Sequence, residues 1–231
     1  MESLLDLSGK VAVITGGSRG IGKAIAYAYA EHGADVVIAS RKLDNCVEVA
    51  EDIAARTGRR TLAVGTHVGR WDECNALADK VLETFGRVDI LVNNAGMSPL
   101  YEKVTDITED YYDKVSAVNL KGLSRLSLRL GGWMFDHDGG VVLNISTIGS
   151  VRPSRNEVVY AMAGVGPQRH DGGVGRRPRP QGPGQLHPSR GDPDRHLQGV
   201  EPRDDRPRPR HAHGARRLRR GLPRRGAVLR Q

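Results

Sequence analysis

Short runs rich in valine and isoleucine alternate with longer helical patterns between residues 11 and 145. The runs lack a polar face, which predicts strands buried on both sides of a sheet, at Val11–Thr15, Asp35–Ser40, Arg60–Gly65, Val88–Val92 and Val141–Ile145. The helical patterns cover Ile21–His32, Leu43–Thr57, Trp71–Phe85 and Thr108–Phe135. This alternation predicts parallel strands joined by right-handed helical crossovers, in a doubly wound α/β sheet. Ligands of such sheets bind beyond the carboxyl ends of the strands.

The composition changes abruptly near residue 164. Residues 1–164 carry 21 acidic and 18 basic side chains, whereas residues 165–231 carry 17 arginines, no lysine and six acidic residues. The second segment also holds ten prolines and eleven glycines, and it has no phenylalanine, tyrosine, tryptophan or isoleucine. It can bury too little apolar area to offset the entropy of ordering. We therefore expect one domain over residues 1–163, truncated after about five strands, and a disordered tail over residues 164–231.

The cysteine usage and the absence of a recognisable targeting signal predict a cytoplasmic protein. Cys46 and Cys74 form neither a disulfide framework nor a metal-binding spacing, so we expect reduced thiols and no metal site. The segment Met1–Asp6 is acidic and lacks the basic and apolar regions of a signal peptide. No apolar run reaches the roughly 20 residues of a membrane span, so no membrane partner is expected.

A glycine-rich loop, Thr15–Gly22, joins the first predicted strand to the first predicted helix. Gly16 permits the tight turn, Gly20 lets the backbone approach a pyrophosphate, and Gly22 lets helix and strand pack closely. The free N–H groups at the start of the helix favour an anion. The loop thus predicts a Rossmann-type dinucleotide site. The loop residues expected to contact the cofactor are Gly16, Ser18, Arg19, Gly20, Ile21 and Gly22.

The end of the second strand indicates which dinucleotide is bound. An acidic residue there would accept hydrogen bonds from the ribose hydroxyls and favour NAD. This chain has Ser40, Arg41 and Lys42 instead, with Arg19 in the glycine loop. Two guanidinium groups suit a 2′-phosphate by charge and by forked geometry. We therefore predict NADP rather than NAD, with Ser40 and Arg41 beside the phosphate; the alternative is a solvated basic loop.

Further motifs, taken with the glycine loop, resemble those of the short-chain dehydrogenase/reductase family, in particular the ketoacyl-reductase and glucose-dehydrogenase type. They are Asn93-Asn94-Ala95-Gly96, Val118-Asn119-Leu120, Asn144-Ile145-Ser146-Thr147, and Tyr160 thirteen residues after Thr147. The resemblance covers residues 8–163. It implies reversible hydride transfer between NADP(H) and a small carbonyl compound or secondary alcohol. It also implies a homo-oligomer, although the elements that normally supply subunit contacts are missing here.

The resemblance assigns a role to each matching side chain. Tyr160 matches the general acid that protonates the carbonyl oxygen as hydride arrives. Thr147 matches the serine that hydrogen-bonds this oxygen, with Ser146 as the weaker alternative, and Asn119 matches the residue that positions a water in the proton relay. Without the family, these residues could be a core tyrosine, a strand-end turn and a helix asparagine bonded to backbone. The remaining cofactor contacts implied are His67, Val68, Asn94, Ala95, Gly96 and Tyr160.

Two residues depart from the family pattern. His67 stands where an acidic residue usually contacts the adenine; an imidazole can stack or hydrogen-bond there, or it is simply a surface histidine. Gly164 stands where the family has a lysine that binds the nicotinamide ribose and lowers the pKa of the tyrosine. A phenol ordinarily titrates near about pH 10, so it needs such a cation to act at neutral pH. Glycine can do neither, and we expect the chain as written to be inactive.

Two explanations of the basic tail remain open. In the first, which we favour, the reading frame slips near codons 164–167, because GC-rich DNA read out of frame yields arginine, proline and glycine codons. A shift of one base makes residues 167–198 compatible with a helix and then a strand ending in Pro-Gly, as the family requires, although it does not cleanly recover the lysine. In the second, the chain is a non-enzymatic dinucleotide-binding protein whose tail binds nucleic acid electrostatically, without aromatic residues to stack on bases.

Overall fold

The structure is a computed structural model that describes residues 5–152 and 154–170, with side chains through residue 164. Its last helix, α7 (Val158–His170), continues past the domain boundary expected at residue 163. Buried Val159, Ala161 and Ala163 anchor the first turns of this helix, and each further residue is added at little cost once a helix has formed. The rest of the predicted disordered tail, residues 171–231, lies outside the described residues.

A five-stranded parallel sheet forms the centre of the fold, with the strand order β3-β2-β1-β4-β5. The strands are β1 (Val11–Thr15), β2 (Asp35–Ser40), β3 (Thr61–Gly65), β4 (Ile90–Asn93) and β5 (Val141–Asn144). Central β1 is fixed in register on both sides, since Val13 pairs with Val37 of β2 and with Leu91 of β4. The chain reverses its direction of winding between β1 and β4. The predicted doubly wound parallel sheet is confirmed.

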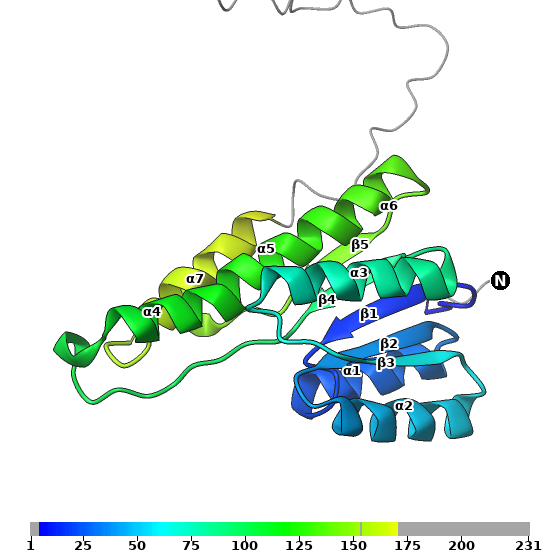
Figure 1. The fold of residues 1–231 in the computed structure, drawn as a ribbon, viewed down its shortest axis with the longest axis horizontal. Coiled ribbons are helices and arrows are strands. Elements are labelled where there is room, and N and C mark those ends of the chain that lie inside the picture. The colour runs from blue at the N-terminus through cyan, green and yellow to red at the C-terminus, as the bar shows by residue number, and fades with distance from the viewer. Residues whose placement is uncertain (1–4, 153, 171–231) are drawn as a thin grey trace, which may run out of the picture. The chain divides into compact units, whose positions relative to one another are not determined.

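Helices cover both faces of the sheet (Figure 1). Along β1, Ala12 and Ile14 point into one apolar core, with the buried residues of α1 (Gly20–Glu31) and α2 (Leu43–Thr57). Val13 points into the other core, with α3 (Trp71–Phe85) and the long helical segment over residues 109–136. This alternation follows from the two-residue period of a strand, and burial on both faces explains why the strands read as continuous apolar runs.

The predicted helix over Thr108–Phe135 is present but is not a uniform α-helix. It consists of α4 (Glu109–Ser116), the π-helical η2 (Ala117–Gly122), α5 (Leu123–Leu126), the π-helical η3 (Ser127–Gly131) and α6 (Gly132–Asp136). Thr108 caps its start by accepting a hydrogen bond from the N–H of Tyr111 at 3.1 Å. Single π turns inside helices are often found at functional sites. Two short 3-10 helices, η1 (Val104–Asp106) and η4 (Ile148–Ser150), precede α4 and α7.

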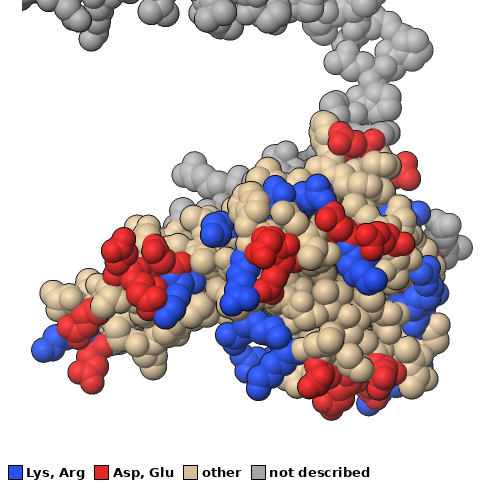
Figure 2. All heavy atoms as spheres, in the orientation of Figure 1, with Lys and Arg blue, Asp and Glu red and all other residues tan. Residues whose placement is uncertain are grey.

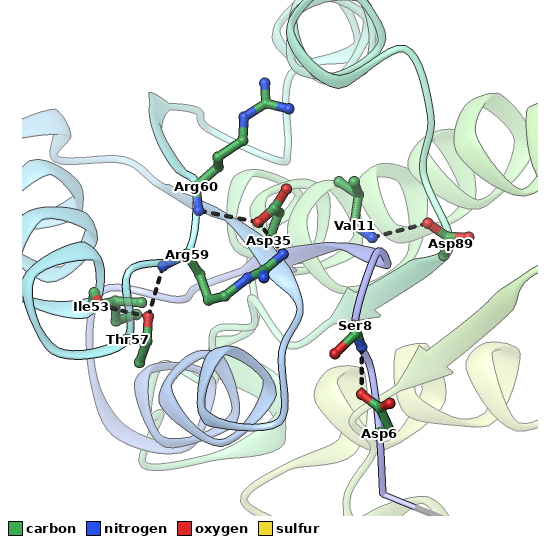
Figure 3. Close-up of polar contacts among 9 residues, drawn as sticks. All are labelled: Asp6, Ser8, Val11, Asp35, Ile53, Thr57, Arg59, Arg60 and Asp89. Atoms are coloured by element: carbon green, nitrogen blue, oxygen red, sulfur yellow. Dashed lines mark hydrogen bonds and ion pairs between the residues drawn. The ribbon is translucent and has the colours of Figure 1, made fainter. Parts of the chain in front are cut away.

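Carboxylates tie down the strands at the amino end of the sheet (Figure 3). Asp35 Oδ1 accepts hydrogen bonds from the backbone N–H of Arg60 at 3.1 Å and from the Arg59 guanidinium at 2.9 Å. Asp89 Oδ2 accepts from the backbone N–H of Val11 at 2.9 Å.

Acidic and basic side chains lie beside one another on the surface shown in Figure 2. Several form helix ion pairs, such as Lys114 with Asp110 at 2.6 Å and Arg129 with Asp79. Within the described residues, the helices are too short or too polar to cross a membrane. The same part of the chain contains no group of three or more His, Cys, Asp or Glu side chains arranged to hold a metal ion.

Candidate dinucleotide-binding site

A cleft of about 680 Å³ lies at the carboxyl ends of the strands, where the winding reverses between β1 and β4. Such a switch point is the usual ligand site of a doubly wound sheet. The ends of four strands and the loops after them, the first turns of α1 and α2 and one residue of η2 line the cleft: Gly16, Ser18, Arg19, Gly20, Ile21, Ser40, Arg41, Lys42, Asn45, Thr66, His67, Val68, Asn94, Ala95, Gly96, Met97 and Val118.

The glycine loop has the shape that a phosphate requires. A Cβ at Gly22 would lie 2.4 Å from the Gly16 carbonyl oxygen, so only glycine lets α1 start this close to β1. Gly20 has φ of 55°, and nothing lies within 4 Å of the position its Cβ would take. No side chain caps the first turn of α1 at Arg19, and that turn carries no acidic residue. Open space in front of uncapped N–H groups at a helix start fits an anion such as a pyrophosphate.

Asn94 connects the loop after β4 to the glycine loop. Its amide Nδ2 donates to the carbonyl oxygens of Thr15 at 3.0 Å and Gly16 at 3.3 Å. The Thr15 hydroxyl in turn donates to the Val92 carbonyl oxygen at 3.2 Å and accepts from the backbone N–H groups of Asn94 and Ala95. Asn94 therefore lines the cleft while its amide group holds the phosphate loop in place.

Hydroxyl and guanidinium groups gather where β2 ends. Ser18 Oγ lies 2.8 Å from Ser40 Oγ, and both serines line the cleft beside Arg19 and Arg41. The two arginines are exposed, and neither guanidinium forms an ion pair among the described residues. Two free guanidinium groups and two hydroxyls, with no carboxylate between them, suit a dianionic phosphate.

The loop after β3 forms the far end of the cleft. The His67 backbone N–H donates to Glu73 Oε2 at 2.5 Å, a hydrogen bond that lowers the pKa of the Glu73 carboxyl. His67 Nδ1 accepts from the Gly69 N–H at 3.2 Å, which places the proton of the neutral ring on Nε2. Cys74, whose thiol pKa burial raises to about 11, donates to the Val68 carbonyl oxygen. Thr66 also lines the cleft, and its hydroxyl is buried with no hydrogen-bond partner in the described part of the chain.

Asn119 lies in η2, below the cleft. Its side chain is buried, and both ends bond to the backbone of one residue: Oδ1 accepts from the Met97 N–H at 2.8 Å, and Nδ2 donates to the Met97 carbonyl oxygen at 2.7 Å. A Cβ at Gly96 would lie 3.3 Å from this Oδ1. The side chain therefore fixes the loop after β4.

A second group of predicted residues meets at the start of α7. Gly164 lies one helical turn after half-buried Tyr160, on the same face of the helix. Ser146 Oγ donates to the Gly164 carbonyl oxygen at 3.1 Å. A Cβ at Gly164 would lie 3.3 Å from Thr147 Cγ2 and 3.7 Å from Ser146 Oγ. Position 164 thus faces the strand-end segment that carries both candidate hydroxyls.

The structure brings most of the predicted cofactor residues into the one cleft. Gly22 and Tyr160 do not line it: Gly22 packs below it, and Tyr160 lies on α7. Lys42, Asn45, Thr66, Met97 and Val118 also line the cleft, although the sequence did not single them out as cofactor contacts, and no role was predicted for Thr15. Thr15 is the one polar residue of β1, and this was the signal that could have revealed it.

A doubly wound sheet with a glycine loop at its switch point defines a Rossmann-type nucleotide-binding fold. The sequence profile of the short chain dehydrogenase family matches residues 10–166, and the chain belongs to this family. A curated relative, short chain dehydrogenase/reductase astE of Aspergillus oryzae, is 36% identical over 163 residues, which cover 70% of this chain and 62% of the relative. The chain therefore spans about three fifths of that relative's length.

Solved structures show the same relationship. L-Sorbose reductase from Gluconobacter frateurii, complexed with NADPH and L-sorbose, is 33% identical, with a TM-score of 0.67 over 70% of this chain and 61% of that chain. A metagenomic short-chain oxidoreductase in complex with NADP is also 33% identical, with a TM-score of 0.67 over 71% of this chain and 73% of that chain.

Proposed function

We propose that this chain binds NADP(H) in the cleft and belongs to a lineage of NADP-dependent carbonyl reductases, with its own hydride transfer impaired at residue 164. The observation that carries the proposal is the cleft itself. The uncapped helix start and the guanidinium groups of Arg19 and Arg41, which form no ion pair among the described residues, surround one space of dinucleotide size. The NADPH and NADP complexes of the two similar structures support the same cofactor.

The preference for NADP(H) is tested by comparing the dissociation constants of NADPH and NADH in a fluorescence titration. We expect NADPH to bind at least about tenfold more tightly, because two charge-assisted contacts are available to the 2′-phosphate. Arg41→Ala should remove most of this preference and leave NADH binding nearly unchanged. Arg56→Ala is the matched control, since Arg56 is an exposed arginine that pairs with Asp52 outside the cleft. Equal affinity for both dinucleotides in the unaltered chain would contradict the preference.

The proposed roles in the reaction follow the positions of the side chains. The bound dinucleotide would supply or accept the hydride at the carbonyl carbon of the substrate. Tyr160 would donate its phenolic proton to the carbonyl oxygen, and Thr147, or Ser146, would hold that oxygen through its hydroxyl. Asn119 would serve the proton relay indirectly, because its side chain holds η2 against the backbone of Met97. The substrate class proposed is a small carbonyl compound or secondary alcohol.

Glycine at position 164 is the proposed cause of low activity. A side chain there would be directed toward Thr147 and Ser146, so Gly164→Lys would add a cationic side chain on the face of α7 that meets the candidate hydroxyls, after a small shift of Thr147 and Ser150. We expect Gly164→Lys to raise NADPH-dependent reduction of a panel of small ketones and ketoses by about a hundredfold, the usual contribution of a tuned proton donor. Gly164→Met, of similar length and without charge, is the control. Equal rates for the two variants would show that the missing cation is not the limiting defect.

A further inference from the structure

Three side chains form a line from the cleft into the core beneath the end of β2. Ser18 Oγ and Ser40 Oγ are 2.8 Å apart, and Ser40 Oγ is 3.1 Å from Cys46 Sγ. The two serines line the cleft, whereas Cys46 is fully buried in the first turn of α2. The sulfur also lies 3.9 Å from the Ser40 carbonyl oxygen. Within the described residues, therefore, Ser40 supplies both oxygen atoms that the thiol contacts.

Each member of this line can donate or accept a hydrogen bond, so the line can point in two directions. In the inward direction, Ser18 donates to Ser40, Ser40 donates to the sulfur, and the thiol turns to the Ser40 carbonyl oxygen. In the outward direction, the thiol donates to Ser40 Oγ, Ser40 donates to Ser18, and Ser18 keeps its proton for a group in the cleft. Hydrogen bonds in such a series polarise one another, which strengthens the terminal donor.

The two dinucleotides differ in what they require of this line. An ionised phosphate offers acceptor oxygens, so a 2′-phosphate favours the outward direction, in which a proton points into the cleft. A 2′-hydroxyl can donate or accept and favours neither direction. Arg19 and Arg41 attract the phosphate by charge, but they do not decide the direction in which the serine hydroxyls point.

We propose that Cys46 is a positioning residue for cofactor choice, because its buried S–H donates to Ser40, which directs the Ser40 hydroxyl toward Ser18 and the Ser18 hydroxyl toward the 2′-phosphate of NADP(H). Cys46 does not touch the ligand and acts through Ser40. The inference rests on the proposed binding of NADP(H) in this cleft. It adds a determinant of specificity that lies outside the cleft.

The test compares the dissociation constants of NADPH and NADH for variants of the full chain at one fixed ionic strength, since screening changes the phosphate contacts. Cys46→Val keeps a small buried side chain but removes the donor, and Cys46→Ser keeps a donor. We expect Cys46→Val to weaken NADPH binding by about threefold to tenfold, the worth of one hydrogen bond, and NADH binding by less than about twofold. Cys46→Ser should retain the preference of the unaltered chain.

Two controls separate this role from a merely structural one. Cys74→Val alters an equally buried thiol, one that bonds to a carbonyl oxygen rather than to a hydroxyl, and should leave the ratio of the two constants unchanged. In a Ser40→Ala background, Cys46→Val should have no further effect on the ratio, because the line is already broken.

The possible outcomes bear separately on the two proposals. Cys46→Ala provides the same comparison should the valine variant not fold, as judged by thermal unfolding. An unchanged ratio, or equal weakening of both dinucleotides, overturns the role of Cys46 while NADPH binding by the unaltered chain still supports the proposed function. Failure of the unaltered chain to bind either dinucleotide overturns both.

Discussion

Asp89 joins three parts of the chain at the amino end of the sheet. Its carboxylate accepts the backbone N–H of Val11 at 2.9 Å and two hydrogen bonds from the Arg87 guanidinium at 2.9 and 2.6 Å. Its backbone N–H donates to the Val11 carbonyl oxygen, and its carbonyl oxygen accepts from Val141. Burial raises the pKa of Asp89, but the hydrogen bonds from Arg87 and Val11 outweigh this effect and hold the pKa below its usual value. The charged form is therefore the one that stabilises the fold.

Asp89→Asn should lower the free energy of unfolding by about 2 kcal/mol at pH 7, the typical worth of hydrogen bonds to a charged group. Because the folded pKa lies below the unfolded value of about 3.9, the contribution is fully present above that value and is lost as the pH falls through the folded pKa. Urea unfolding at pH 7 and at pH 3 measures both effects. Asp110→Asn, in an exposed pair with Lys114, should cost less than about 0.5 kcal/mol. A difference between the Asp89 variant and the unaltered chain that is the same at both pH values would contradict the charge argument.

Among single residues, the sequence identified those whose residue type alone limits what the position can bind. Glycine in the loop after β1 and arginine after β2 are examples, since few other residues could bind phosphate in those places. The engagement of Asn94 with Thr15, and of Asn119 with Met97, could not be predicted in the same way. The first pair lies 79 residues apart in sequence and the second 22, and only the folded chain brings them within hydrogen-bond distance.

The long helical segment over residues 109–136 shows how packing changes an element. The sequence predicted a continuous helix from its apolar periodicity, which carries no information about π turns. Within η2, the Asn119 side chain bonds to the Met97 backbone, and Gly122 packs against the loop after β3. A Cβ at Gly122 would lie 1.9 Å from the Val68 carbonyl oxygen. The close approach of η2 to that loop therefore depends on glycine.

Gly122→Ala should lower the free energy of unfolding by about 1–3 kcal/mol, because the added methyl group must push η2 away from the Val68 backbone. It should also weaken dinucleotide binding, since Val68 and Val118 both line the cleft. Gly132→Ala is the matched control in the same helical segment, where nothing lies within 4 Å of the added Cβ. That change should stabilise the helix by about 0.5–1 kcal/mol. Thermal unfolding and NADPH titration of both variants test this; similar effects at the two glycines would contradict it.

For the molecule as a whole, the apolar surface around β5 shows that the described part of the fold lacks a cover. β5 is an edge strand, and Val141 and Leu143 on it are 58% and 39% exposed. Ile148 and Val151, which follow this strand, are 77% and 67% exposed. Parallel sheets normally bury both faces beneath helices, and an exposed apolar edge strand invites pairing with other chains. A sequence that continued to follow the family would be expected to supply this cover.

The match to the family ends at residue 166, inside the interval of codons 164–167 where the change in composition predicts a slip of the reading frame. We expect resequencing of codons 155–205 to find a base gained or lost there, and a second change at the junction that supplies a lysine codon four positions after Tyr160. The frame-corrected protein should cover β5, remain monodisperse or form a defined oligomer in sedimentation velocity, and oxidise NADPH with a carbonyl substrate. The chain with residues 165–231 as written should associate nonspecifically through β5.

An unchanged reading frame would contradict this explanation and leave the nucleic-acid-binding alternative. That alternative requires salt-dependent binding to RNA or DNA that disappears when residues 165–231 are removed.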